Sequence, residues 1–453
     1  MNWSARFIAF PCILLLGCTP PSALENTAPL VSGGIRYQQS SSTYAGNSGP
    51  WWNSFSDPTL NKEVTTALSG NLAQQQLASR IRQASASLKK EGAALFPQID
   101  LTAETSLDSI SSGDSDDTAA LGSLLSWEID VFGSTRSGIR ARSRELDATL
   151  QDWLGGRLLL SAAVAETRFL ILEQRARLLV LRKQIETNET LLNLVGLRVG
   201  QGISSRVDIL QQERQLDATK ALIPEAEAEL GASEYALDIL TGNSPGTRKR
   251  DSRNTLPSLP GNPGTGVPSD LLRNRPDLLS QWNSILAMDA EVGQALADRL
   301  PRFIISASVD AGVIDSLRSV ASSLVGEMIA PITDGGSRRA EIELRRAALE
   351  EALLAYSSTY IEAIRDVETA LLRERKQAER IRLTDRQLTT ARETLKETRI
   401  QYSQGLSDYL PVIDALTAVQ TLELSILSLR REALTLRVAL HRALGGPMPR
   451  TQP

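Results

Sequence analysis

The sequence predicts a mainly α-helical protein with a β-sheet portion, built from two tandem copies of one structural unit. Three observations lead to this prediction. Short glycine-containing motifs recur at one constant separation, four segments alternate polar and apolar residues, and two long segments without proline carry apolar residues at heptad spacing. Alternation is typical of half-buried strands, and heptad spacing is typical of long helices that pack side by side.

The repeat shows as pairs of matching residues that are 203 positions apart. These pairs are Gly133 and Gly336, Gly202 and Gly405, and Gly242 and Gly445, while Pro97 and Pro301 keep the same register to within one residue. One shared separation over most of the chain is hard to obtain by chance. We therefore interpret the mature chain as two repeats, at 58–242 and 269–446, followed by a tail at 447–453. The intervening segment 243–268 is rich in Gly, Pro, Ser and Asn, and we expect an irregular linker there.

The N-terminus has the pattern of a bacterial lipoprotein signal. An apolar run that is too short to span a membrane ends at Gly17, directly before Cys18. We therefore expect a signal peptide at 1–17, a covalent lipid on Cys18 and a lipidated N-terminal extension at 18–57. The alternative is an ordinary secretory signal in which the cysteine is incidental.

Composition and charge exclude several classes of protein. The chain has 453 residues with 49 basic and 53 acidic side chains, a net charge of −4 and no long basic run, so we do not expect it to bind nucleic acid. The single histidine, His441, and the two cysteines are too few for most metal centres and catalytic triads. We therefore expect no catalytic residue, no metal site and no cofactor apart from the covalent lipid on Cys18.

Two strand pairs are predicted, at about 97–131 in the first repeat and about 301–330 in the second. Apolar residues such as Leu101, Leu121 and Trp127 occupy alternate positions, with polar residues between them. Each strand has about 12 residues, close to the length that crosses a bilayer when tilted. The polar face carries several acidic residues, which either line a lumen and favour cations or form an ordinary solvated face: Asp100, Glu104, Glu128 and Asp130.

The remaining segments are predicted to be helices. The longest runs over 136–199, and its counterpart in the second repeat carries the same seam from Ile342 to Leu395. Each long helix ends at a glycine turn, Gly202 or Gly405, where glycine is the usual C-cap residue. The chain then returns through a second helix, and a shorter helix leads into each strand pair. These returning and shorter helices are expected at 203–240, 406–444, about 58–95 and about 269–300.

The predicted topology has a consequence for assembly. The chain has no uninterrupted run of about 20 apolar residues, so we expect no conventional transmembrane helix. Four strands are too few to close a barrel, for which about eight is the practical minimum, and an open sheet edge in lipid leaves backbone groups without hydrogen bonds. We therefore expect several copies of the chain to assemble into one barrel that continues into a bundle of long helices.

Five groups of residues stand out as motifs. They are Asp57-Pro58 with Leu60 after Trp52 and Phe55, the stretch from Trp127 to Gly133 with Arg136, the stretch from Leu271 to Asp277, the turn from Tyr402 to Gly405, and Ala443 to Gly446. Together they resemble the TolC-like outer membrane factors over 51–446. The lipobox and Arg275-Pro276-Asp277 are most similar to the OprM-type efflux lipoproteins.

The resemblance implies a homotrimer with a 12-stranded barrel, four strands from each copy, continuous with an α-helical periplasmic tunnel. It implies three kinds of partner, namely a periplasmic adaptor protein, an inner-membrane RND-type pump and outer membrane lipid. Gly202 and Gly405 would then lie at hairpin tips that contact the adaptor. The resemblance also assigns a periplasmic gate, formed by Tyr402, by Asp208 through pairing and by Asp414 as one member of a ring around the axis. The alternative is that Asp208 and Asp414 are only solvated charges near helix starts, where the helix dipole favours them.

The second tip departs from the family pattern at two positions. Ser407 stands where some members carry an arginine that ties the gate shut, and Pro411 stands where they carry an aspartate. Arg206 is near enough in sequence to replace that arginine. The sequence therefore does not determine which contacts close the gate.

The function expected from these observations is a passive exit duct in the outer membrane of a tripartite efflux system, carrying small compounds such as drugs out of the periplasm. One alternative is the exit duct of a type I protein secretion system. Another is a lipid-anchored periplasmic coiled-coil scaffold without a pore, which the alternating strand pairs argue against. The transported compounds and the cognate pump cannot be identified from the sequence.

Overall fold

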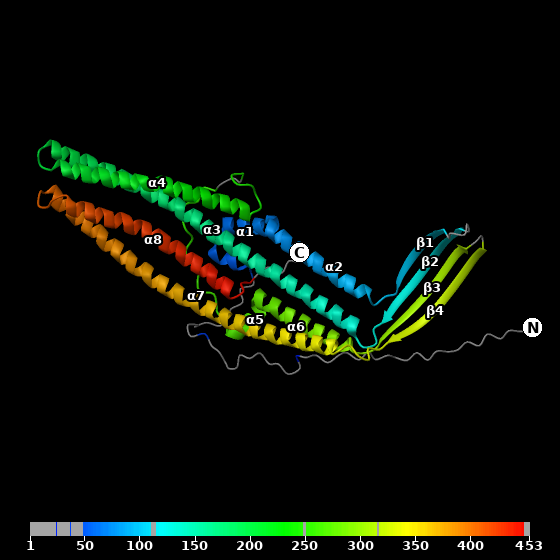
Figure 1. Cartoon of the computed structure of the whole chain (residues 1–453). Helices are drawn as coiled ribbons and strands as arrows, with labels where there is room; N and C mark the ends of the chain where they lie inside the picture. The colour runs from blue at the N-terminus through cyan, green and yellow to red at the C-terminus, as the bar shows by residue number, and fades with distance from the viewer. Residues whose placement is uncertain are drawn as a thin grey trace, which may run out of the picture. The chain divides into compact units, whose positions relative to one another are not determined.

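The computed structural model describes residues 24, 37, 49–109, 115–247, 251–314 and 317–447 (Figure 1). The predicted signal peptide and Cys18 lie outside these residues. The helices are η1 (Trp51–Phe55), α1 (Pro58–Gly70), α2 (Leu72–Ala93), α3 (Ser134–Gly200), α4 (Arg206–Leu240), η2 (Pro268–Asp270), α5 (Leu271–Asn274), α6 (Pro276–Ala297), α7 (Ser337–Ser403) and α8 (Leu410–Ala443). The strands are β1 (Gln98–Ser109), β2 (Ser115–Ile129), β3 (Arg302–Ile314) and β4 (Leu317–Ile329).

The chain divides into two compact units. Within the described residues, the first unit contains 80–150 and 280–357, and the second contains 49–79, 151–279 and 358–447. The first unit therefore holds the whole sheet and the helix segments next to it. The second holds the pairs of long helices and their tips. The two longest helices, α3 and α7, have 67 residues each, or about 100 Å at 1.5 Å per residue.

The four strands form one antiparallel sheet in the order β1-β2-β3-β4. The pairing of β2 with β3 joins the hairpin of the first repeat to that of the second, so that both repeats contribute to one continuous sheet. Within the described residues, β1 and β4 are its two edges. Mainly helical architecture with two hairpin-and-helix repeats is therefore confirmed, and the joining of the hairpins is new information from the structure.

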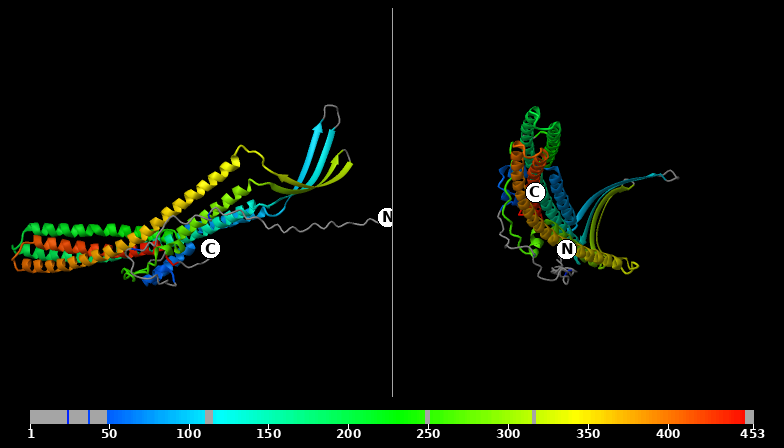
Figure 2. Two further views of the ribbon diagram at one scale, coloured as in Figure 1. Left: turned by 90° about the horizontal axis from the view of Figure 1, so that it is seen from below. Right: turned by 90° about the vertical axis from the view of Figure 1, so that its left-hand side faces the viewer.

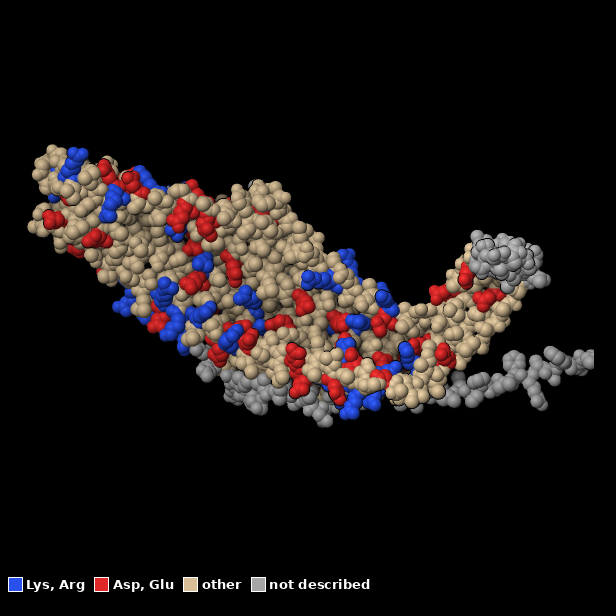
Figure 3. Space-filling model, viewed as in Figure 1, with Lys and Arg blue, Asp and Glu red and all other residues tan. Residues whose placement is uncertain are grey.

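The register divides the sheet into an apolar face and a polar face. Ile99, Leu125, Ala307 and Leu324 form one row across all four strands, and Ile99 and Leu324 are 71% and 77% exposed. The opposite face contains rows such as Asp100, Leu124, Ser308 and Ser323. Lys, Arg, Asp and Glu gather along the helices and are sparse on the strands (Figure 3). The predicted alternation is confirmed, and it leaves a large apolar sheet face exposed.

One acidic residue does not belong to the polar strand face. Asp130 follows the end of β2, and its carboxylate accepts hydrogen bonds from the backbone N–H groups of Thr135 and Arg136 at 3.3 and 2.9 Å. Its equivalent in the second repeat, Asp334, accepts from the backbone of Gly336 and Arg338. The expectation for Asp130 was therefore wrong, because a carboxylate at this position satisfies free N–H groups at the start of a long helix.

Each of the two shorter helices expected from the sequence is broken into two. The segment 58–95 divides at Asn71, which is extended with ψ 129°, and the segment 269–300 divides at Arg275, which is extended with ψ 118°. Proline at 276 explains the second break, since it disfavours helical geometry in the preceding residue. At the first break, the Asn71 side chain donates to the carbonyl of Leu240 at 3.0 Å. The end of α4 therefore contacts α1 and α2 at this break.

Glycines allow α4 and α8 to end against these breaks, and each such meeting of a helix end with a break is called a junction. Gly242 and Gly445, which are equivalent in the two repeats, have φ of +79° and +81° at the ends of α4 and α8. A Cβ atom at Gly242 would lie 2.2 Å from the carbonyl oxygen of Gly70, and one at Gly445 would lie 2.4 Å from that of Asn274. Neither backbone conformation nor available space permits a side chain there. The same junction is therefore built twice.

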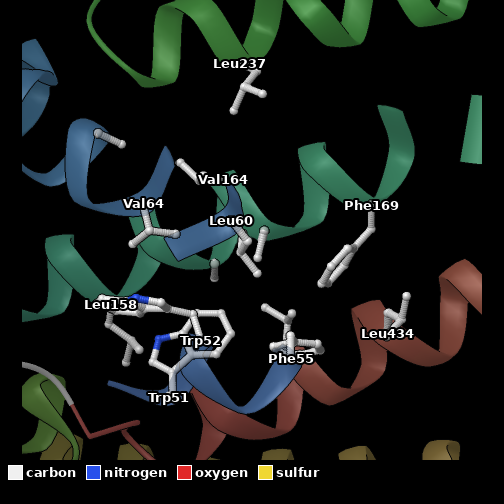
Figure 4. Close-up of a cluster of buried hydrophobic side chains, with 14 of the residues drawn as sticks. Trp51, Trp52, Phe55, Leu60, Val64, Leu158, Val164, Phe169, Leu237 and Leu434 are labelled. Atoms are coloured by element: carbon white, nitrogen blue, oxygen red, sulfur yellow. The ribbon is translucent and has the colours of Figure 1, made fainter. Parts of the chain in front are cut away.

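The main hydrophobic core of the second unit is formed by η1, α1, α3, α4 and α8 (Figure 4). Trp51 is 2% exposed, donates from Nε1 to Ser161 Oγ at 3.1 Å and stacks on His441 at 5.4 Å. Burial, together with the nearby Arg437, lowers the pKa of His441 to about 4, so the imidazole is neutral at physiological pH. Residues 51–57 are the end of the N-terminal extension expected at 18–57, and their aromatic side chains therefore belong to the hydrophobic core.

A buried ionic cluster connects this core to the linker. The Arg168 guanidinium, 2% exposed, donates to Asp57 at 2.8 Å and pairs with Glu63 at 3.2 Å and Asp251 at 3.0 Å. Asp57 also caps α1 through the backbone N–H groups of the first turn. Loss of one member of such a cluster costs about 3–5 kcal/mol, because it leaves a buried charge without its partner. The part of the linker that the structure describes is irregular, as expected, but ion pairs fix it to α3.

One helix among the described residues, α8, has the length and apolar composition of a membrane-spanning segment. No such helix was expected from the sequence, which has no uninterrupted run of about 20 apolar residues. Half of its most apolar window is buried against other parts of the structure, and its inward side chains include Leu429, Leu434 and Val438. Packing inside the second unit explains its apolar composition, as in the core helices of soluble proteins.

The junction at Gly445 gives a test of the fold. Gly445→Ala should lower the free energy of unfolding by about 2 kcal/mol or more, because left-handed geometry alone costs a non-glycine residue about 1–3 kcal/mol. Thermal unfolding followed by circular dichroism at 222 nm would measure the loss. Gly231→Ala is the matched control, since that position is helical and its added Cβ meets nothing within 4 Å. Equal melting temperatures for the two variants would contradict the assignment of the junction.

Candidate functional site

The tips of the two helical hairpins form the candidate site. Both lie in the second unit, where α3 turns into α4 and α7 turns into α8, and the tips lie side by side (Figure 2). Gly202 and Gly405 have φ of +73° and +75°. In each turn the glycine N–H bonds three residues back and the next N–H bonds five residues back, which is a Schellman motif. The C-cap interpretation of both glycines therefore agrees with the geometry.

Tyr402 is the centre of the contacts between the two tips. Its side chain is 3% exposed, and its hydroxyl lies 2.8 Å from Ser204 Oγ. The Arg198 guanidinium stacks on the Tyr402 ring at 4.4 Å and donates to the carbonyl oxygen of Ser403 at 3.1 Å. Arg198 and Ser204 belong to the first tip, whereas Tyr402 and Ser403 belong to the second. A cation–π contact and hydrogen bonds therefore hold the tips together within one copy of the chain.

A second tyrosine extends this contact below the tips. Tyr409, 1% exposed, packs against Tyr402 at 5.2 Å and donates its hydroxyl hydrogen to Gln212 Oε1. Gln212 is fully buried, and its amide donates to the backbone oxygen of Asn188 at 2.9 Å. Burial, followed by the nearby Tyr402 and Asp208, raises the pKa of Tyr409 above its ordinary value, so the phenol stays protonated. Polar groups of α3, α4 and α8 thus form one connected network.

The two predicted gate carboxylates lie outside this network. Asp208 is half-buried in the first turn of α4, and Asp414 is exposed between the buried residues Ile413 and Ala415. Among the described residues, no ion pair includes either carboxylate. Tyr402 bonds to Ser204 and not to Asp208. The gate assignment of Asp208 and Asp414 therefore remains a prediction.

The departures at the second tip have local explanations. Pro411 lies in the first turn of α8, where a proline is favoured because its missing N–H has no partner in a helix. Ser407 donates to the carbonyl oxygen of Asp408 at 3.2 Å. Arg206 begins α4 and is exposed. The arginine that connects the tips is instead Arg198, which none of the sequence motifs includes. Its only signal in the sequence is that it is a basic residue in the last turn of a long helix.

The described residues contain no cluster of three or more His, Cys, Asp or Glu side chains that could hold a metal ion. The arrangement at the tips can hold two hairpins together or release them, and it offers no nucleophile beside a base. The contacts at the tips are therefore packing contacts and hydrogen bonds between two hairpins.

Comparison with known proteins identifies the family. A family model described as Outer membrane efflux protein matches 64–243 and 267–446, which is more than half of the chain. The chain belongs to this family. The pyoverdine export outer membrane protein OpmQ of Pseudomonas aeruginosa is 26% identical over 458 residues, which cover 96% of this chain and 95% of OpmQ. The probable outer membrane lipoprotein SilC of Salmonella typhimurium is 23% identical over 407 residues, which cover 87% of each chain.

The fold agrees with the solved structure of an outer-membrane channel. The outer-membrane channel OprN superimposes with a TM-score of 0.83 at 25% identity, covering 96% of this chain and 99% of that one. The chain is therefore an outer membrane efflux channel of tripartite efflux pumps and not an enzyme, with its helical part in the periplasm. As such a component it works with pump partners. The resemblance, the function class and the localisation expected from the sequence are confirmed.

The buried network gives a test at the tips. Tyr409→Phe should destabilise the protein by about 1–3 kcal/mol, because it leaves the buried Gln212 oxygen without a donor. Thermal unfolding and hydrogen exchange of the tip residues would measure this loss. Tyr402→Phe is the control, since its partner Ser204 is only half-buried and can bind water instead. If the control were the more damaging variant, the network would not have the role described here.

Proposed function

We propose that the channel is a homotrimer whose three sheets form one 12-stranded barrel in the outer membrane. The observation that carries this proposal is a sheet with one exposed apolar face, one polar face and two edges. In lipid, the apolar face must point outward, and the edge strands β1 and β4 must pair with strands of neighbouring copies. The polar face then lines the lumen.

The partners follow from the role of an exit duct. The resemblance of the lipobox and of Arg275-Pro276-Asp277 to the OprM-type efflux lipoproteins supports an inner-membrane pump of the RND type as the source of energy. A periplasmic adaptor would connect this pump to the duct, and the exposed glycine turns at Gly202 and Gly405 are the surfaces proposed for its contact. Near these turns several apolar side chains are exposed, among them Ile203 at 58% and Leu406 at 74%. Small compounds in the periplasm are the proposed cargo.

The tips are also the proposed gate. Tyr402 holds the second hairpin against the first, and Asp208 lies near enough to Tyr409 to affect its hydroxyl electrostatically. Asp414 is exposed on the returning helix, one helical turn beyond Pro411. In a trimer whose tips converge, three copies of Asp414 would surround the axis, and their mutual repulsion would favour bound cations. Opening would then require the contacts around Tyr402 to break.

The assembly can be tested directly. Detergent-solubilised protein should be a trimer by native mass spectrometry, and the purified trimer should form discrete conducting channels in planar lipid bilayers. Unpaired sheet edges make membrane insertion and oligomerisation inseparable. A stable monomer with the full β content, or a trimer that conducts no ions, would overturn the proposal.

Lipidation gives a second test. Mass spectrometry of the mature N-terminus should find an acylated Cys18, because the preceding segment has a lipobox and SilC is described as a lipoprotein. Acyl chains on Cys18 would anchor the protein firmly in the membrane. Cys18→Ser should impair sorting to the outer membrane more than folding, since the sheet does not depend on the lipid. An unmodified chain that starts at another residue would disprove the assignment.

The gate gives a third test. Asp414→Ala should keep the trimer but raise single-channel conductance and weaken block by divalent cations, because an exposed aspartate contributes little to stability. Asp217→Ala is the matched control, since Asp217 is also an exposed aspartate but lies further from the tips, on α4. If conductance and divalent block of Asp414→Ala equal those of the parent protein, Asp414 is a surface charge and not part of the gate.

A further inference from the structure

The second unit contains a cavity of about 670 Å³ that has no part in the tips. It lies where α8 ends near the start of α6, and α3 and α7 complete its walls. Part of its lining is aliphatic, from Leu158 and Leu159 of α3 and Leu436 and Ala439 of α8. Cavities of this size accommodate drug-sized molecules, which bury their apolar parts against such walls.

The charged groups in the lining are mainly basic. Arg365 and Arg373 come from α7, Arg442 comes from α8, and Arg275 lies at the start of α6, whereas the acidic residues are only Asp277 and Asp366. Residues 365, 369 and 373 line the cavity at four-residue intervals, so they share one face of α7. Guanidinium groups from two facing helices therefore border one space.

The two carboxylates are already occupied. Arg275 donates to both oxygens of Asp277, at 3.0 and 2.7 Å, and lies 3.5 Å from Asp366. Asp366 also accepts from Arg365 at 3.1 Å. Although burial opposes it, these hydrogen bonds from Arg275 hold the pKa of Asp277 below its ordinary value, so the carboxylate stays charged. Neither acid is free to bind a cation.

Two guanidinium groups remain for a ligand. In the part of the chain that the structure describes, Arg373 and Arg442 form no ion pair. Arg442 interacts electrostatically with Glu166, a carboxyl whose pKa burial raises, but the two side chains form no ion pair. Planar guanidinium groups bind carboxylate and phosphate oxygens through paired hydrogen bonds. The basic side of the cavity therefore suits an anion, and the aliphatic side suits an apolar body.

We propose that this cavity is a binding site for amphipathic anions, in which Arg373 and Arg442 hold a carboxylate or phosphate and the aliphatic wall holds the apolar part of the same molecule. The ligand is either an anionic solute on its way through the duct or the headgroup region of an anionic lipid. The first source rests on the proposed function, because a duct exposes its walls to the compounds that it exports.

Binding can be measured on the purified trimer without any transport. In isothermal titration calorimetry, 1-naphthyl phosphate should bind saturably at one site per chain. Inorganic phosphate lacks the apolar body and the uncharged 1-naphthyl glucoside lacks the anion, so each should bind at least tenfold more weakly. Saturable binding that is equal for all three probes, or no binding of 1-naphthyl phosphate, would overturn the site.

Variants locate the binding. Arg373→Gln with Arg442→Gln should weaken 1-naphthyl phosphate at least tenfold, whereas Arg386→Gln should leave it unchanged. Arg386 is an exposed arginine of α7 that lies outside the cavity and, among the described residues, forms no ion pair. Circular dichroism and native mass spectrometry would establish that each variant is a folded trimer. Undiminished affinity in the double variant would disprove the assignment even if the channel conducts normally, so this result is independent of the proposed function.

The source of the ligand can be distinguished separately. Native mass spectrometry of protein purified from its own membranes should show a retained anionic phospholipid if the ligand is a lipid, and the double variant should lose it. If no lipid is retained but 1-naphthyl phosphate binds, the ligand is a soluble anion. Retention of the same phospholipid by the double variant, together with unchanged binding of the probe, would contradict the proposed site.

Discussion

The hydrogen bonds of the sheet edges are the constraint on which the rest of the structure depends. Strands β1 and β4 end a sheet whose apolar face is exposed, and in lipid no water can satisfy their free N–H and C=O groups. The barrel proposed above would satisfy these groups by pairing the edge strands with those of other copies of the chain. The joining of β2 to β3 brings the hairpins of both repeats into one sheet, so each copy has two edges and not four.

The repeat explains how such long helices are anchored. The carboxylates of Asp130 and Asp334 cap the starts of α3 and α7, and glycines in left-handed geometry end α3, α4, α7 and α8. Because Gly242 and Gly445 fit against the breaks in the shorter helices, each returning helix meets the start of another helix end to end. The backbone groups at these ends are thereby satisfied by a small number of residue types used twice.

The second unit contains two groups of buried polar contacts that differ in how many partners each side chain has. The cluster around Arg168 is closed, because several carboxylates surround one guanidinium, and it fixes the linker and the aromatic segment that begins at Trp51. The contacts around Tyr402 are fewer and lie near exposed turns, where water can replace them. Because Arg198 and Ser204 are only half-buried, the proposed opening of the tips would break contacts that water can replace, while the core of the same unit stays intact.

Sequence alone determined the repeats, the strand pairs, the long helices and the family, because each depends on local periodicity or on motifs such as Arg275-Pro276-Asp277. Tertiary structure decided what depends on distant residues. Asp130 lies at a helix start, and the shorter helices divide where α4 and α8 end. Arg198 is the arginine that joins the two tips. Tertiary structure also gathered arginines of α6, α7 and α8 around one cavity. Such contacts join residues that are dozens to hundreds of positions apart, and no periodicity in the chain encodes which of them will meet.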